Sequence, residues 1–168
     1  GLIHVNGDGA VLPRNGSIPQ SSEEYTVVIA ASLANYFVEQ KRALGFTAYV
    51  PHREVYQPER VHRQLLHILE TLAVARSKSP YTLAETMSLE TPYMSRGTTI
   101  IAITASLDPA WIFELQVLAK KGMRPMAILL DPTTFGGYGD VDSVRSMLRL
   151  GKVPSLTISY GDDLSAAL

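Results

Sequence analysis

Apolar residues recur at helical spacing in several stretches, each preceded by a residue that favours a helix start. Ser21 is followed three residues later by Glu24, as in a capping box, and an amphipathic series then runs towards Gly45. Pro58 and the pair Asp108–Pro109 precede two further series. The pattern predicts helices that begin near these residues, the first of them ending near Gly45. Shorter helices are predicted at 82–87, at 142–150 and from Asp162.

Short runs rich in β-branched and aromatic residues alternate with the predicted helices. The run at 98–104 is continuously apolar, which is typical of a strand covered on both faces. Two closely spaced runs predict adjacent strands, with one short antiparallel strand near 53–57. The predicted strands are 2–5, 46–50, 54–56, 98–104, 126–130 and 156–160. This alternation predicts an α/β fold with a doubly wound, mostly parallel sheet and helices on both faces, a Rossmann-like three-layer arrangement.

Three glycines stand between a predicted helix and the strand that follows it, namely Gly45, Gly122 and Gly151. A glycine in the left-handed conformation allows the chain to turn back sharply at such a place. The N-terminal segment has two interpretations. Residues 2–5 form the first central strand, or they pair with 10–12 as a hairpin around the Asn6-Gly7 and Asp8-Gly9 turns.

Composition narrows the classes of protein to be considered. A length of 168 residues, 46% hydrophobic, with a mean hydropathy of +0.07, predicts a single domain over 1–168. A net charge of -1 gives no basic footprint for nucleic acid or for a membrane surface. The absence of cysteine, of a long apolar span and of a secretory leader pattern favours a cytoplasmic location.

Polar residues follow three of the predicted parallel strands, where ligands bind in open α/β sheets. Asn6 and Asp8 follow the first strand, Thr104 and Ser106 follow the strand at 98–104, and Asp131 follows the next. Their oxygens are suited to a hard cation such as Mg²⁺ or Mn²⁺. The same residue types also cap helices and shape turns, so both interpretations stand at this stage.

Catalytic motifs are absent from the sequence. The glycine-rich stretches "NGDGAVLPRNG" and "FGGYGD" lack the spacing of dinucleotide and P-loop motifs. His62 and His67 are five residues apart, which is not the spacing of a zinc protease, and no G-x-S-x-G elbow occurs. We therefore expect no enzymatic activity. A flavodoxin-like nucleotide- or flavin-binding enzyme is the alternative that the expected fold leaves open.

Five stretches, in order and spacing, resemble the C-terminal part of the bacterial domain of unknown function fifty-eight family, which is similar to a von Willebrand factor A domain. They are "SSEEYTVVIAASLANYFVEQKRALGF", "ERVHRQLLHILETLAVAR", "RGTTIIAIT", "LAKKGMRPMAILLDPTTFGG" and "GKVPSLTISYGDDLSAAL". In A domains a metal-ion-dependent adhesion site carries D-x-S-x-S after the first strand and a later aspartate. On that pattern Asn6 replaces the aspartate, Asp8 and Ala10 replace the serines, and Ala105 replaces the later aspartate.

The resemblance implies that the chain is a fragment of a longer, membrane-anchored protein and makes no membrane contact itself. Members of the family are commonly encoded beside MoxR-type AAA ATPases, which implies a partner or adaptor role for such an ATPase. The leading hypothesis is thus a non-enzymatic protein-interaction module without a cofactor. The alternative is a cation-dependent ligand-binding domain with a degenerate metal site formed by Asn6, Asp8, Thr104 and Ser106.

Overall fold

The computed structural model describes residues 2–5, 21–40, 44–50, 52–59 and 81–167. Its strands form one six-stranded sheet in the order β3-β2-β1-β4-β5-β6. The strands are β1 (Leu2–Val5), β2 (Leu44–Val50), β3 (His52–Glu59), β4 (Thr99–Thr104), β5 (Arg124–Leu130) and β6 (Ser155–Ile158). The β2–β3 pair is antiparallel and every other pair is parallel. The predicted α/β class, the mostly parallel sheet and the antiparallel strand near 53–57 are thereby confirmed.

Strand β1 lies in the middle of the sheet, between β2 and β4. Its residues pair in parallel with both neighbours, Ile3 with Phe46 on one side and with Ile101 on the other. The central-strand interpretation of 2–5 is therefore correct. Residues 10–12, the other half of the alternative hairpin, lie outside the described residues.

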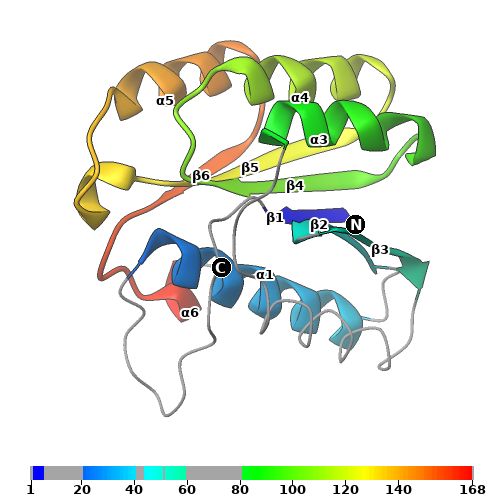
Figure 1. Cartoon of the computed structure of the whole chain (residues 1–168), viewed down its shortest axis with the longest axis horizontal. Helices are drawn as coiled ribbons and strands as arrows, with labels where there is room; N and C mark the ends of the chain where they lie inside the picture. The colour runs from blue at the N-terminus through cyan, green and yellow to red at the C-terminus, as the bar shows by residue number, and fades with distance from the viewer. Residues whose placement is uncertain (1, 6–20, 41–43, 51, 60–80, 168) are drawn as a thin grey trace.

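Helices cover both faces of the sheet (Figure 1). The helices α1 (Ser22–Glu39) and α6 (Leu164–Ala167) lie on one face, and α3 (Leu83–Glu90), α4 (Ala110–Lys120) and α5 (Val141–Leu150) lie on the other. Two short 3₁₀ helices, η1 (Thr91–Tyr93) and η2 (Pro132–Phe135), lie in the connections. None of the described helices is both long enough and apolar enough to cross a membrane.

The core forms two layers because side chains along β4 alternate between the faces of the sheet. Ile101 and Ile103 pack with α1, whereas Ile100 and Ala102 pack with α3, α4 and α5. All four are buried, so β4 is covered on both faces as its apolar sequence predicts. The predicted inner face of α4 is also buried and consists of Trp111, Ile112, Leu115 and Leu118.

Side-chain caps begin α1 and α3 near the residues that the sequence predicts, whereas α4 starts after Pro109 without a side-chain cap. The Ser21 hydroxyl accepts a hydrogen bond from the Glu24 N–H at 3.2 Å and caps α1. The same arrangement begins α3, where the Glu85 N–H donates to the Thr82 hydroxyl and the Thr82 N–H donates to the Glu85 carboxylate.

Two predicted boundaries are wrong, and both lie at one irregularity of the β2–β3 pair. α1 ends at Glu39, so Gly45 lies inside β2 rather than at a helix end. Pro58 lies inside β3 instead of opening a helix. The register shifts between Leu44 and Phe46 of β2. A bulged edge strand tolerates proline, because a proline there forfeits no ladder hydrogen bond, and a bulge is also a common place for glycine.

The helix–glycine–strand pattern has a different origin at each of its two remaining positions. Gly122 adopts a φ of +92°, and the chain turns there from α4 into β5 as predicted. Gly151 has a φ of -74°, and the left-handed residue after α5 is Lys152, at φ 54°. The pattern therefore marks both connections. At the second one, however, Lys152 adopts the left-handed conformation that was predicted for Gly151.

Leu115→Ala is expected to lower the free energy of unfolding by about 2 to 5 kcal/mol, because Leu115 is fully buried between α4 and the sheet. Leu150→Ala removes the same atoms from a side chain that is 83% exposed and should change it by less than about 0.5 kcal/mol. Urea unfolding of the two variants measures the difference. Equal losses would contradict the assignment of α4 to the core.

Candidate functional site

Of the polar residues predicted to form a site, Thr104, Ser106 and Asp131 lie at or just after the ends of parallel strands. The sheet has a switch point between β1 and β4, because the chain adds strands β2 and β3 on one side of β1 and strands β4 to β6 on the other. Ligands bind at such a switch point in open α/β sheets. Val5, the last residue of β1, pairs with Ile103, which precedes Thr104 in β4. Asn6 and Asp8 lie outside the described residues. Of the four candidate ligands, the structure therefore positions Thr104 and Ser106.

Thr104 and Ser106 belong to a chain of hydrogen bonds that shapes the loop between β4 and α4. The Thr104 hydroxyl accepts from the Ser106 N–H at 3.0 Å, and the Ser106 hydroxyl accepts from the Asp108 N–H at 3.2 Å. The Asp108 carboxylate accepts from the Ala110 N–H at 3.0 Å. The buried Trp111 indole donates to the Ser106 carbonyl at 3.1 Å. Both candidate hydroxyls thus have a structural task in the turn.

Asp131 has a comparable task after β5. Its carboxylate accepts hydrogen bonds from the Thr133 N–H at 3.0 Å and from the Thr133 hydroxyl at 2.6 Å, which begins η2. Within the described ranges, no group of three His, Cys, Asp or Glu side chains is arranged to hold a metal ion. The described residues alone therefore do not form a carboxylate-rich cation site, and such a site depends on Asn6 and Asp8.

The glycine-rich loop at 133–139 does not form a phosphate cradle. Gly136 and Gly139 have φ values of +86° and +137°, and the loop leads to the start of α5. There the Asp140 carboxylate accepts a hydrogen bond from the Ser143 N–H at 3.0 Å. A carboxylate already occupies the helix end at which a phosphate would bind, and its negative charge repels an anion.

An aromatic cluster of Tyr25, Phe135 and Tyr160 joins three separate segments at this edge. The ring centroids of Tyr25 and Phe135 are 5.0 Å apart and those of Phe135 and Tyr160 are 5.7 Å apart, both pairs edge to face. The Tyr25 hydroxyl accepts a hydrogen bond from the Gly161 N–H at 2.8 Å. The first turn of α1 is thereby fixed to the loop after β6, although 136 residues separate them in the chain.

The loops after β5 and β6 are also tied directly to each other. The Tyr160 N–H donates to the Thr134 hydroxyl at 2.9 Å, and that hydroxyl donates to the Asp131 carbonyl at 2.8 Å. Sequence reasoning missed the aromatic cluster, because its members lie in three segments whose proximity only the folded sheet creates. The available clue was an aromatic residue at the end of the predicted strand 156–160, namely Tyr160, which in the structure follows β6.

We use the name carboxyl edge for the loops 105–109, 131–140 and 159–163. These loops carry five aspartates and neither lysine nor arginine, so the described part of this edge is acidic. The aspartates are Asp108, Asp131, Asp140, Asp162 and Asp163. Hydrogen bonds from the Ser165 hydroxyl and N–H hold the pKa of the Asp163 carboxyl below its ordinary value, which keeps it negatively charged.

Two tyrosines of the carboxyl edge are accessible to a partner. Tyr138 is 93% exposed and Tyr160 is 49% exposed, although Tyr160 packs on its inner side against the aromatic cluster. Figure 1 shows η2, the start of α5 and α6 gathered at this end of the sheet. The edge thus combines exposed aromatic rings, negative charge and loops fixed by hydrogen bonds.

No protein-family model matches the chain, and no curated protein matches it in sequence. Solved structures of similar fold do exist. BatB from Bacteroides thetaiotaomicron, described as a conserved hypothetical protein, aligns with a TM-score of 0.65 at 14% identity over 99% of this chain and 92% of its own. The pilus adhesin SpaC from Lactobacillus rhamnosus GG aligns with a TM-score of 0.65 at 10% identity, over 98% of this chain and 29% of its own.

Proximal thread matrix protein 1 from the mussel byssus aligns with a TM-score of 0.60 at 13% identity, over 98% of this chain and 42% of its own. At these identities the likeness concerns the fold alone. Proteins that share little sequence with this chain therefore have a similar fold.

Tyr25→Phe is expected to lower the free energy of unfolding by about 0.5 to 1.5 kcal/mol, because the Gly161 N–H loses its acceptor. Tyr36→Phe removes a hydroxyl from an exposed ring of the same helix and should be neutral within about 0.5 kcal/mol. Urea unfolding compares the stabilities, and hydrogen exchange at the Gly161 amide should accelerate in Tyr25→Phe only. An unchanged exchange rate would contradict the role given to this bond.

Proposed function

We propose that the chain is a non-enzymatic protein-interaction module of the von Willebrand factor A type, which binds its partner through the carboxyl edge. The aromatic cluster of Tyr25, Phe135 and Tyr160 carries the proposal. It joins the first turn of α1 to the loops after β5 and β6 and leaves Tyr160 half-exposed, and Tyr138 of the same edge is 93% exposed. Aromatic rings on a rigid support are typical of the residues that dominate binding energy at protein interfaces.

The polar chemistry of the described carboxyl edge supports binding rather than catalysis. The hydroxyls of Thr104, Ser106 and Thr134 and the carboxylate of Asp131 each take part in a hydrogen bond within their loops. A general acid or base has to lie within reach of the substrate and to have a tuned pKa. These side chains instead form hydrogen bonds with the backbone of their own loops. One protein of similar fold is named a pilus adhesin and another a thread matrix protein, and neither name denotes an enzyme.

The partner that we propose is a MoxR-type AAA ATPase, which follows from the resemblance to the domain of unknown function fifty-eight family. The five aspartates of the carboxyl edge favour a partner surface rich in lysine and arginine. A cytoplasmic location of this domain, within a longer membrane-anchored protein, is part of the same proposal.

Tyr138→Ala is expected to weaken binding of the neighbouring MoxR-type ATPase by roughly five- to thirtyfold, because an exposed ring would lose its contact with the partner. Tyr36→Ala, at an exposed ring on α1 outside the carboxyl edge, is the matched control and should bind as the parent does. Biolayer interferometry with the purified ATPase measures both, and affinity should also fall as salt is added. Lack of binding by the parent chain, or equal binding by all three proteins, would refute the proposal.

A degenerate cation site is the second candidate, and the pairing of β1 with β4 favours it. Asn6 and Asp8 follow β1 in the sequence, and β1 pairs with β4, which ends at Thr104, where the strand order reverses. In this alternative Asn6, Asp8, Thr104 and Ser106 would supply oxygen ligands to Mg²⁺ or Mn²⁺, with water completing the shell.

Saturating Mg²⁺ or Mn²⁺ should then raise the melting temperature by several degrees, because a cation that binds only the folded state stabilises it. Asp8→Ala should abolish the shift, whereas Asp142→Ala, at an exposed carboxylate on α5, should preserve it. Differential scanning fluorimetry gives the measurement. A melting temperature that neither ion changes would exclude this candidate.

A further inference from the structure

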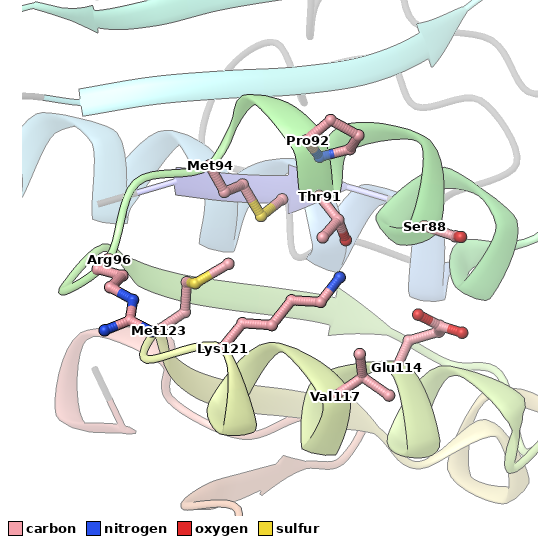
Figure 2. A pocket seen from close by; sticks show the side chains of 9 residues that line it. All are labelled: Ser88, Thr91, Pro92, Met94, Arg96, Glu114, Val117, Lys121 and Met123. Atoms are coloured by element: carbon pink, nitrogen blue, oxygen red, sulfur yellow. The ribbon is translucent and has the colours of Figure 1, made fainter.

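A pocket of about 480 Å³ lies between α3 and α4, on a helical face of the sheet rather than at the carboxyl edge. Its side chains come from the end of α3, from η1 and the segment before β4, and from α4 with the turn after it (Figure 2). They are Ser88, Thr91, Pro92, Met94, Arg96, Glu114, Val117, Lys121 and Met123. We call this pocket the α3–α4 groove.

The floor of the α3–α4 groove is apolar and adaptable. Met94 and Met123 both extend into the space between the helices, where Met123 is 7% exposed. Val117 of α4 is 39% exposed and lies on the other side of the Lys121 side chain (Figure 2). Methionine side chains are flexible and polarizable, so they fit apolar partners of varied shape. Two further apolar side chains next to the lining residues in sequence, Leu89 and Tyr93, are 47% and 68% exposed. Exposed apolar side chains therefore also occur on α3 and η1, the two elements that border the pocket.

Charge is distributed unevenly along the α3–α4 groove. Arg96 lies at one end, Glu114 lies at the other, and the Lys121 side chain runs across the groove towards Thr91 (Figure 2). Neither Arg96 nor Lys121 has an ion-pair partner among the residues that the structure describes. Two exposed cations beside an apolar floor recognise an apolar group that stands next to a carboxylate.

The length of the groove matches a short peptide. Glu114 and Val117 of α4 and the cap residue Lys121 line the same side of the groove over two helical turns, which is about 10 Å along the axis. A segment of two turns can place apolar side chains on the methionine floor and an acidic residue beside Lys121 and Arg96. The acidic carboxyl edge repels the same segment, so the two surfaces select different ligands.

We propose that the α3–α4 groove binds an amphipathic peptide segment of a partner protein, in which leucine-like side chains contact Met94, Met123 and Val117 and Asp or Glu pairs with Arg96 and Lys121. The proposal does not depend on binding at the carboxyl edge. It adds a second contact surface of opposite charge to the same domain.

Fluorescence anisotropy with two dye-labelled peptides tests the proposal on the whole chain. The first is a capped peptide with two leucines three residues apart, followed by two glutamates, and the second carries two lysines in place of the glutamates. The parent chain should bind the glutamate peptide at least about tenfold more tightly than the lysine peptide. Equal affinities, or binding of the lysine peptide alone, would overturn the proposal.

Variants locate the binding site. Lys121→Glu should weaken the glutamate peptide by roughly three- to tenfold and strengthen the lysine peptide, whereas Lys120→Glu makes the same charge change outside the groove lining and should do neither. Val117→Asp should abolish measurable binding of the glutamate peptide, and Leu150→Asp on α5 should preserve it.

All four altered side chains are exposed, and thermal unfolding verifies that each variant folds. If Lys120→Glu and Lys121→Glu have equal effects, the cations act as a general field and the groove assignment is wrong. Peptide binding that stays the same when decanoate is added in excess supports a peptide site. Tight binding of decanoate with no peptide binding would overturn the proposal in favour of a small amphipathic anion.

Discussion

Burial of β4 on both faces is the interaction on which the rest of the structure depends. Ile101 and Ile103 pack under α1, and Ile100 and Ala102 pack under the opposite helical layer, so β4 belongs to both cores. Its neighbour β5 does the same, with Ile128 and Leu130 on one face and Ala127 and Leu129 on the other. Removal of this apolar surface from water stabilises each helical layer against the same sheet. Because both helical layers pack on the same central strands, the connections from both faces meet at the ends of the sheet.

The carboxyl edge is a consequence of that meeting. α1, which is capped by Ser21, begins at this edge, and the loops after β5 and β6 lie at the same edge. Tyr25 of α1 contacts Phe135 and Tyr160 of these two loops. The hydroxyl of Tyr25 then accepts the Gly161 N–H, and side-chain hydrogen bonds satisfy the remaining turns. A loop region fixed in this way presents exposed tyrosines in a defined geometry, which lowers the entropic cost of binding.

The two surfaces proposed for binding differ in charge although the chain as a whole is almost neutral, with a net charge of -1. Aspartates gather at the carboxyl edge, where short polar side chains begin helices and form turns. Arg96 and Lys121 lie at the α3–α4 groove, near the ends of the segments that enter β4 and β5. The overall charge hides this separation, and electrostatic complementarity at each surface selects partners of opposite sign.

The sequence by itself determined the elements whose cause is local. Side-chain chemistry within a few residues accounts for the caps at Ser21 and Thr82, the apolar face of α4 and the two-sided burial of β4. The alternation of helices and strands along the sequence determined the α/β class. The candidates Thr104 and Ser106 were predicted to lie at the end of a central strand for the same reason, because the apolar run ends there.

Only the tertiary structure decided what distant segments do together. Gly45 and Pro58 carry strong local preferences, yet the β2–β3 pairing overrides them and places both within strands. The choice of a central position for β1 depends on its pairing with β2 and β4, and the aromatic cluster joins residues far apart in the chain. Such contacts are set by packing of the complete sheet, and no short window of the sequence contains them.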